Sequence, residues 1–284
     1  MGIVYLNGKY LPIEDATVSV LDRGFVYGDG VYELVPVYNR KPFRLAEHLV
    51  RLKNSMDRIR LTNPYGNDEW AAILTRVIAE QPFDNQGVYF QVTRGVAKRD
   101  HAFPQGVTPT VFMMSNPLAT PSPDVIANGV ACVTAVDERW LNCDIKSISL
   151  LGNVLMRQLA ADNDAVETVM FRDGFLTEAS ASNVLIVKDG IVVAPPKDRM
   201  ILPGITYGAT YDFAREGGMA FEIHPIRESE VWDADELWLT SSTKEVVAIV
   251  TLDGRAVGDP AHVGKPGPAF RQMHELFQKA KSAL

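Results

Sequence analysis

The stretch WLNCDIKSISLLGNVL, residues 140–155, places a single lysine among apolar neighbours. Ile145 precedes Lys146, and Leu151 and Val154 follow it in a run with helical spacing. Most lysines keep their charged end in water. A lysine that loses contact with water gives up its proton more readily, and the neutral amine can then attack a carbonyl and form a Schiff base. The stretch therefore predicts either a surface lysine or a reactive one, and the sparse polar cover favours the second.

The chain on both sides of this stretch mixes helix and strand patterns without a strict alternation. Apolar periodicity predicts helices at residues 44–61, 68–81, 149–163 and 270–281. Asn67 is the expected N-cap of the second of these. Strand patterns occur at residues 87–95, 109–115 and 129–136, and hairpin turns are expected at Asn7-Gly8, Asp173-Gly174 and Asp189-Gly190. The predicted fold class is α+β, a mixed α/β arrangement.

A proline-rich segment interrupts these patterns near the middle of the chain. The sequence NPLATPSPD, residues 116–124, breaks every periodicity and is typical of a linker. The prediction is an N-terminal α/β domain over 1–118, a linker over 119–124 and a C-terminal α/β domain over 125–284. A cleft between two such domains is a common place for a ligand.

Composition and charge exclude several classes of protein. With 46% hydrophobic and 22% charged residues, the 284-residue chain has the composition of a globular protein with a substantial core. Its formal net charge of -7 argues against nucleic acid as the main partner. The start MGIVYLNGKYLP lacks a signal-peptide pattern, and no apolar run predicts a membrane span. Cys132 and Cys143 are expected to be reduced thiols in the cytoplasm. The five histidines are scattered, so no metal site is expected.

A reactive Lys146 needs an aldehyde or ketone, and the most common resident aldehyde is pyridoxal phosphate. Such a cofactor needs a carboxylate that keeps its pyridine nitrogen protonated, and Glu178 in TEASASN is the candidate. LPGIT, residues 202–206, predicts a helix start whose free N–H groups favour a phosphate, and TSST, residues 240–243, adds hydroxyls. Arg51 can pair with a phosphate bidentately. Taken singly, each of these features also has an ordinary structural explanation. Glu178 can be an exposed glutamate and Arg51 a helix-surface arginine. LPGIT can be a glycine turn, and TSST can supply ordinary strand-end hydroxyls.

Together these motifs resemble those of a known family. Arg51 in EHLVRL, Lys146 in CDIKS, Glu178 in TEASASN and the LPGIT segment look like the fold-type IV, or class IV, pyridoxal-phosphate aminotransferases. The resemblance runs from about residue 3 to residue 255. It implies two α/β domains, the second a pseudo-barrel, with the cofactor in the interdomain cleft. It also implies a homodimer whose site borrows from the partner.

The resemblance assigns roles to individual residues. Lys146 is expected to hold the cofactor as a Schiff base and to carry the proton between the substrate α-carbon and the cofactor. Glu178 is expected to bond the pyridinium nitrogen, and Leu202 to pack on the ring. The expected phosphate ligands are Arg51, Ile205, Thr206 and Ser242.

Two further segments point to the substrate. GDGVYE, residues 28–33, and VTRGVAKRDH, residues 92–101, look like the pattern of bacterial D-amino-acid aminotransferases. Carried over, Tyr32, Arg99 and His101 form a trap for the substrate α-carboxylate, which an arginine fork suits well. The expected reaction is transamination between a D-amino acid, of the D-alanine or D-glutamate type, and a 2-oxo acid.

Other readings stay open beside this one. An L-branched-chain aminotransferase, an (R)-amine transaminase and aminodeoxychorismate lyase share the fold, and a non-catalytic metabolite-binding protein is a more remote alternative. Two positions depart from the family pattern: Leu185 stands where an aromatic residue is usual, and Tyr207 where a basic residue is usual. Asp22 and Arg23 are expected to form a local ion pair at the surface.

Overall fold

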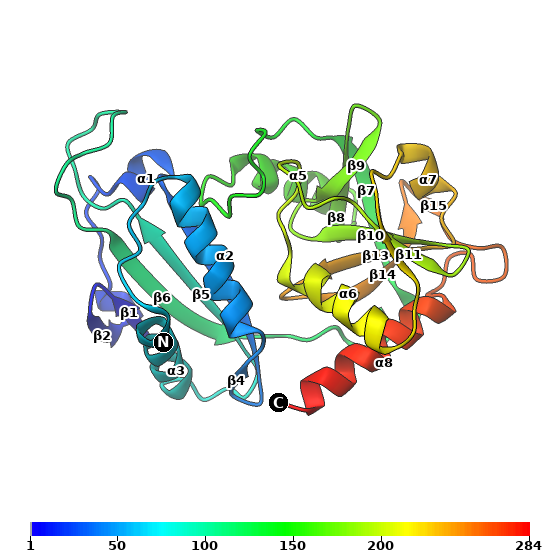
Figure 1. The fold of residues 1–284 in the computed structure, drawn as a ribbon, viewed down its shortest axis with the longest axis horizontal. Coiled ribbons are helices and arrows are strands. Elements are labelled where there is room, and N and C mark those ends of the chain that lie inside the picture. The colour runs from blue at the N-terminus through cyan, green and yellow to red at the C-terminus, as the bar shows by residue number, and fades with distance from the viewer. Residues whose placement is uncertain (1) are drawn as a thin grey trace. The chain divides into compact units, whose positions relative to one another are not determined.

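The computed structural model describes residues 2–284 and divides into two compact units (Figure 1). Unit 1 contains residues 2–119, the segment Ile145–Leu150 and Leu284. Unit 2 contains Thr120–Asp144 and Leu151–Ala283. The chain therefore enters unit 2 and returns to unit 1 for the six residues around Lys146 before it continues in unit 2.

Unit 1 is built on an antiparallel sheet with the order β2-β1-β6-β5-β3-β4. Its strands are β1 (Ile3–Leu6), β2 (Lys9–Pro12), β3 (Gly30–Tyr38), β4 (Lys41–Pro42), β5 (Gln86–Thr93) and β6 (Thr110–Pro117). β3 and β5 pair along their whole length, from Gly30 opposite Thr93 to Val37 opposite Gln86. The predicted hairpin at Asn7-Gly8 joins β1 to β2, since both residues have the positive φ that such a turn requires.

The helices of unit 1 are η1 (Ile13–Asp15), α1 (Arg23–Tyr27), α2 (Leu45–Arg58) and α3 (Asn67–Ala79). α2 packs on β3, and α3 packs on β1, β5 and β6 (Figure 1). Both predicted helices are confirmed, but α2 begins after Arg44, whose φ of 54° is left-handed. The N-cap of α3 is Gly66 and not Asn67, because the helix already includes Asn67.

The short helix α1 was not predicted from the sequence. The Asp22 carboxylate caps it by accepting a hydrogen bond from Gly24 N at 2.8 Å. Arg23 is 4% exposed and pairs with Asp29 at 2.7 Å. The expected surface ion pair between Asp22 and Arg23 is therefore wrong, because the two side chains serve different partners in the interior of unit 1.

Unit 2 is built on a mixed sheet with the order β12-β11-β10-β13-β14-β7-β8-β9, and β15 pairs with β14. The pairs β11–β12, β14–β7 and β7–β8 are parallel. The strands are β7 (Val130–Val136), β8 (Glu167–Arg172), β9 (Phe175–Ala179), β10 (Asn183–Lys188), β11 (Ile191–Ala194), β12 (Phe221–Ile223), β13 (Glu236–Ser241), β14 (Glu245–Leu252) and β15 (Arg255–Ala256).

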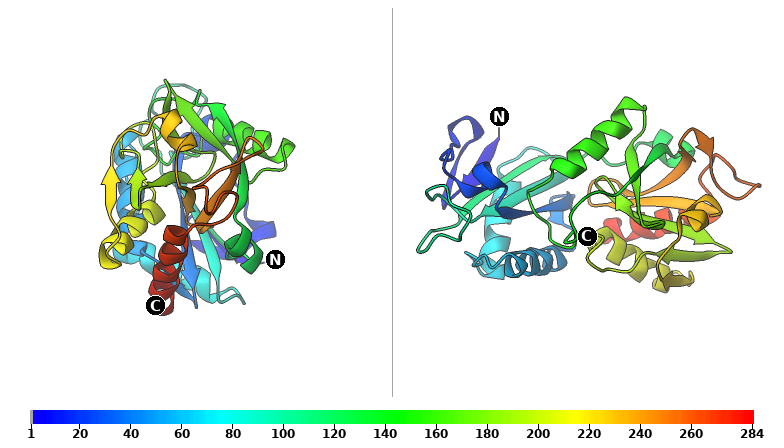
Figure 2. Two further views of the ribbon diagram at one scale, coloured as in Figure 1. Left: turned by 90° about the vertical axis from the view of Figure 1, so that its right-hand side faces the viewer. Right: turned by 90° about the horizontal axis from the view of Figure 1, so that it is seen from above.

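The helices of unit 2 are α4 (Pro123–Asn128), α5 (Leu151–Asp162), α6 (Ile205–Glu216), α7 (Glu228–Trp232) and α8 (Pro268–Ser282). α6 and α8 lie side by side and pack on β13, while α5 packs on β7 and β8 (Figures 1 and 2). The predicted helices at 149–163 and 270–281 are confirmed with slightly different ends.

Each unit has its own hydrophobic core. The core of unit 1 includes Leu52, Trp70 and Phe90, and Ile145 of the returning segment joins it. The core of unit 2 includes Val169, Leu237 and further aliphatic residues of its sheet. The predicted mixed α/β class is confirmed. Within residues 2–284, no helix combines the length and the apolar character needed to cross a membrane.

Candidate active site

Lys146 lies in unit 1 on the segment Ile145–Leu150, which runs beside the start of β3. The Lys146 carbonyl accepts a hydrogen bond from Tyr32 N at 2.9 Å, and the Lys146 N–H donates to Ser55 Oγ of α2 at 3.1 Å. Its Nζ lies 4.1 Å from the centroid of the Tyr32 ring, an attractive position for a cation. The backbone of Lys146 is thus fixed from two sides, and its side chain is half-buried.

The apolar cover expected around Lys146 is only partly present. Ile145 is buried in the core of unit 1. Leu151 and Val154, on α5 of unit 2, are 72% and 59% exposed. Leu151 and Val154 are therefore largely open to solvent within a single chain. The Tyr32 ring is the apolar group that contacts its Nζ.

A buried ion pair lies on α2 and β3 of unit 1. Arg51 Nε and Nη2 donate to the two oxygens of Glu33 at 2.7 and 2.9 Å, and His48 Nδ1 lies 2.7 Å from Glu33 Oε2. Glu33 and His48 are fully buried and Arg51 is 6% exposed. Arg51 is therefore not a helix-surface arginine. Sequence reasoning missed Glu33, although a lone charge in the apolar strand VYELVPVY was a usable signal.

Burial and neighbouring charges shift the pKa of Glu33 in opposite directions. Burial by itself would raise the pKa of Glu33, but the charge of Arg51 and the hydrogen bonds from Arg51 and His48 hold this pKa far below its usual range. Burial lowers the pKa of His48, and the neighbouring Glu33 opposes that shift only in part. Glu33 is thus ionised at neutral pH and fixes Arg51.

The three residues predicted to trap a carboxylate occupy two places in unit 1. The Tyr32 ring lies 5.5 Å from that of Tyr89. Arg99 and His101 are exposed and lie together at the ring of Tyr27, each 5.3 Å from its centroid. The structure therefore brings Arg99 and His101 together, and it places Tyr32 beside Tyr89 and Lys146.

Glu178 lies at the end of β9 in unit 2 and is 6% exposed. Arg139 Nη1 donates to its Oε1 at 2.5 Å. Its Oε2 accepts hydrogen bonds from Leu202 N at 2.9 Å and from Asn183 Nδ2 at 3.1 Å. Burial raises the pKa of Glu178 to about 6, against the opposing effect of the Arg139 charge. The reading of Glu178 as an exposed hairpin residue is excluded.

Arg139 is the principal residue of unit 2 that sequence reasoning missed. Its Nε and Nη2 donate to the two oxygens of Asp137 at 2.9 Å each. The Asp137 carboxylate also accepts from Thr177 Oγ1 at 2.9 Å and lies 3.1 Å from Arg172. Nothing in the local pattern DERW marks this arginine, because its partner Glu178 is distant in the sequence.

The LPGIT segment leads into α6, as predicted. Asn183 connects it to the carboxylate site, since Asn183 Nδ2 also donates to Leu202 O at 2.9 Å. A Cβ on Gly204 would lie 2.1 Å from Asn183 Oδ1, so a larger residue there would force Asn183 to move. Thr206 is 4% exposed in the first turn of α6, where backbone N–H groups have no partner within the helix. Leu202 thus contacts Glu178, and Ile205 and Thr206 follow it at the start of α6.

Ser242 lies in the turn between β13 and β14 and is partly exposed. Thr240, two residues earlier, pairs with Asn183 across the sheet. The Thr240 hydroxyl is buried and lacks a hydrogen-bond partner within residues 2–284. An unsatisfied buried hydroxyl is costly unless a ligand uses it.

The two departures from the family pattern lie in the interior of unit 2. Leu185 is fully buried on β10 opposite Trp238. Tyr207 is fully buried, and its hydroxyl donates to Pro195 O at 2.8 Å. Lys197 Nζ lies 4.5 Å from the Tyr207 ring. Lys197 thus places a basic group beside the ring of Tyr207.

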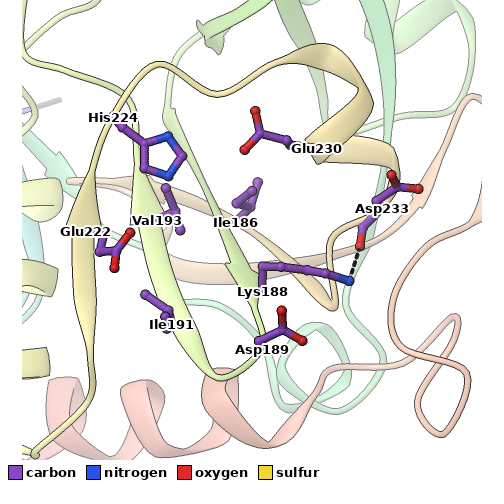
Figure 3. A pocket seen from close by; sticks show the side chains of 9 residues that line it. All are labelled: Ile186, Lys188, Asp189, Ile191, Val193, Glu222, His224, Glu230 and Asp233. Atoms are coloured by element: carbon purple, nitrogen blue, oxygen red, sulfur yellow. Dashed lines mark hydrogen bonds between the residues drawn. The ribbon is translucent and has the colours of Figure 1, made fainter.

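A pocket of about 310 Å³ lies elsewhere in unit 2 (Figure 3). Ile186, Ile191 and Val193 line it together with Glu222 and Glu230. It contains none of the residues predicted from the sequence. Across residues 2–284, no three His, Cys, Asp or Glu side chains are grouped in a way that suits a metal ion.

Comparisons of the sequence with known proteins show its family. The family model for class IV amino-transferases matches residues 30–252. The D-alanine aminotransferase of Bacillus licheniformis is 35% identical over 277 residues, which cover 98% of this chain and 96% of the relative. That of Staphylococcus aureus (strain COL) is 38% identical over 277 residues, covering 97% and 96%.

A solved structure has the same fold. The branched-chain amino acid aminotransferase of Escherichia coli matches with a TM-score of 0.90, covering 98% of this chain and 94% of that one. At 23% identity this likeness establishes the fold alone. The family model, in contrast, spans most of the sequence, and the D-alanine aminotransferases match almost end to end. The resemblance noted in the sequence is thereby confirmed, and the chain belongs to the class IV aminotransferases.

Proposed function

We propose that the protein is a pyridoxal-phosphate-dependent aminotransferase that transfers the amino group of a D-amino acid, of the D-alanine or D-glutamate type, to a 2-oxo acid. The donor leaves as a 2-oxo acid, and a second 2-oxo acid then accepts the amine. The observation that carries this proposal is the buried Glu178 carboxylate with its three donors, in a chain whose near full-length relatives are D-alanine aminotransferases.

Three features of unit 2 fit pyridoxal phosphate. A pKa of about 6 leaves Glu178 ionised at neutral pH, as a partner for a pyridinium requires. The start of α6 offers backbone N–H groups and a helix dipole to a phosphate. The third feature is the buried hydroxyl of Thr240, which has no hydrogen-bond partner within residues 2–284 and lies across the sheet from Asn183. The donors and the acceptor are thus of the kinds that the two ends of this cofactor need.

Each proposed residue has a distinct task. When bound, the cofactor supplies an electron-withdrawing ring that makes the α-hydrogen of an amino acid acidic. Lys146 would hold the cofactor covalently in the resting enzyme and would afterwards carry the proton from the substrate α-carbon to the cofactor. Glu178 keeps the pyridine nitrogen protonated, and Leu202 packs against the ring. The proposed phosphate ligands are Arg51, Ile205, Thr206 and Ser242.

Substrate recognition is assigned to Tyr32, Arg99 and His101. Arg99 offers a planar fork to the α-carboxylate, and Tyr32 and His101 add single hydrogen bonds. A carboxylate fixed on this side directs the α-hydrogen of a D-amino acid toward Lys146. Arg99 and His101 lie beside Tyr27, whereas Tyr32 lies beside Lys146. We therefore propose that the carboxylate site combines Tyr32 of one protomer with Arg99 and His101 of the other.

Exposed apolar side chains support a homodimer. Leu151, Val154 and Leu155 form a stripe on α5 and are 72%, 59% and 57% exposed. In unit 1, Val20 and Phe25 are 70% and 73% exposed. Apolar groups exposed in this way are typical of subunit interfaces. The proposed compartment is the cytoplasm, where free thiols such as the buried Cys132 and Cys143 stay reduced.

A half-reaction without acceptor tests the proposal. The yellow holoenzyme is mixed separately with D-alanine, L-leucine and (R)-1-phenylethylamine, and the cofactor absorption is followed. Loss of the yellow band with D-alanine alone is expected. Loss with L-leucine or with the amine would instead favour a branched-chain or amine transaminase and overturn the roles of Arg99 and His101. A preparation that stays colourless with added cofactor would point to a binding protein.

A further inference from the structure

A buried arginine of α1 holds the loop of unit 1 that carries Arg99 and His101. Arg23, the first residue of α1, is 4% exposed. Its Nη1 donates to Asp100 O at 2.5 Å and to Ala102 O at 3.4 Å, and its Nη2 donates to His101 O at 3.5 Å. One guanidinium therefore holds the backbone on both sides of the His101 side chain.

Arg23 is itself fixed by a half-buried carboxylate. Arg23 Nε donates to Asp29 Oδ2 at 2.7 Å, and Arg94 donates to both Asp29 oxygens at 2.8 and 3.0 Å. The remaining Arg94 bonds go to the carbonyls of Ile59 and Arg60 at 2.8 and 3.1 Å. Burial by itself would raise the pKa of Asp29, but hydrogen bonds from Arg94 and Arg23 lower it, so the carboxylate stays ionised. Arg23 and Arg94 thus bind the same ionised carboxylate, that of Asp29.

Aromatic rings hold the same loop at two further points. Arg94 Cζ lies 3.8 Å from the centroid of the Phe103 ring, a close cation–π contact. The Tyr27 ring contacts Arg99 and His101, each at 5.3 Å. The exposed side chains of Arg99 and His101 therefore project from a backbone that is restrained before and after them.

We propose that Arg23 is a positioning residue for the substrate carboxylate, because its hold on the carbonyls of residues 100–102 fixes the directions of Arg99 and His101. This inference rests on the proposed function, which makes Arg99 and His101 the carboxylate ligands. A planar guanidinium holds several acceptors in fixed directions. Without it the loop samples more conformations, and ordering the loop then weakens substrate binding.

The test compares Arg23→Gln and Arg23→Lys holoenzymes with the wild type. Loss of the charge-assisted bonds in Arg23→Gln is expected to raise KM for D-alanine and pyruvate about tenfold or more. The value of kcat is expected to change less than about threefold, because Arg23 contacts no reacting group. Arg23→Lys keeps a cation beside Asp29, so it is expected to fold and to show an intermediate KM.

Arg40→Gln is the matched control. Arg40, like Arg23, donates to several backbone carbonyls, those of Ile78, Ala79, Gln81 and Phe83, and none of these belongs to the loop. The Arg40 variant is expected to keep the wild-type KM even if its stability falls. A KM increase in Arg40→Gln equal to that in Arg23→Gln would overturn the inference, since a general loss of stability would then explain both.

Hydrogen exchange supplies a readout independent of turnover. Amides of residues 97–106 are expected to exchange faster in Arg23→Gln than in the wild type or in Arg40→Gln. Unchanged exchange in this segment, or an unchanged KM in an enzyme that uses D-alanine, would overturn the inference. A wild type that does not react with D-alanine overturns the proposed function instead, and the exchange rates then decide alone whether Arg23 holds the loop.

Discussion

Arg139 Nη1 donates a hydrogen bond to Glu178 Oε1 at 2.5 Å, so the carboxylate proposed to face the pyridine nitrogen has a buried cation beside it. Arg139 is fixed in turn by Asp137, through Nε and Nη2. Burial raises the pKa of Glu178 to about 6, and the charge of Arg139 opposes a larger rise. The pair therefore sets the pH at which Glu178 is ionised.

Replacing Arg139 with glutamine is expected to raise the pKa of Glu178, because burial is then opposed by no cation at that oxygen. Activity requires ionised Glu178, so it is lost as pH falls through this pKa. The acidic limb of kcat/KM for D-alanine is expected to move up by at least about one pH unit, equivalent to about 1.4 kcal/mol. Arg139→Lys should keep the limb near its wild-type position, and a glutamine variant with an unaltered profile would contradict the assignment.

Gly204→Ala is expected to weaken cofactor binding. Its Cβ would lie 2.1 Å from Asn183 Oδ1, and Asn183 is held by hydrogen bonds to Glu178 and Leu202. A displaced Asn183 disturbs both the carboxylate and the start of α6. The dissociation constant of pyridoxal phosphate, measured by absorbance titration, is expected to rise at least about tenfold.

Gly208→Ala is the control for this change. Gly208 lies in the same helix, and the nearest atom to its added Cβ is Lys197 Nζ at 3.9 Å, an ordinary contact. Alanine also favours the helix over glycine by about 1 kcal/mol. Unaltered cofactor affinity is expected, and equal losses in both variants would argue against the Asn183 explanation.

Lys146→Ala is expected to abolish the half-reaction with D-alanine, with a rate reduced by at least about a thousandfold, since both the covalent link and the proton carrier are lost. Borohydride followed by mass spectrometry is expected to attach the cofactor to Lys146 in the wild type. Lys53, exposed and paired with Asp57 on α2, is the control, and Lys53→Ala should behave as the wild type. Attachment at another lysine would refute the assignment.

Arg99→Ala is expected to raise KM for D-alanine by about tenfold to a hundredfold, because a charge-assisted pair with the substrate carboxylate is lost. The absorption of the bound cofactor should stay the same. Lys98, the exposed preceding residue, provides a control of equal charge in the same loop. Normal D-alanine kinetics in Arg99→Ala would remove this residue from the trap.

Glu33→Gln is expected to destabilise unit 1 by roughly 3–5 kcal/mol, because it removes the buried charge that accepts two hydrogen bonds from Arg51. The depressed pKa of Glu33 gives this effect a pH dependence. Its stabilising contribution is complete above the unfolded value of about 4.3 and is lost as pH falls toward the lower folded value. Urea unfolding is expected to show less acid sensitivity in the glutamine variant. The same acid sensitivity in both proteins would contradict this account.

The sequence predicted the helices and motifs that are defined by residues close together along the chain. The apolar spacing at 44–61 and 68–81 identified α2 and α3, because each buries one face against the sheet. The motifs at Lys146, Glu178 and LPGIT led to the family. Helix α1 was missed because it has only five residues, too few for any periodicity.

The sequence by itself determined the family and the mixed α/β class and supplied the proposed site residues, because these depend on side-chain type and on order along the chain. Tertiary structure alone decided which charges neutralise each other. Arg139 meets Glu178, Arg51 meets Glu33, and Arg23 reaches the carbonyl of Asp100. Such pairs follow from how strands and helices pack, and burial makes each ion require a partner that no local pattern specifies.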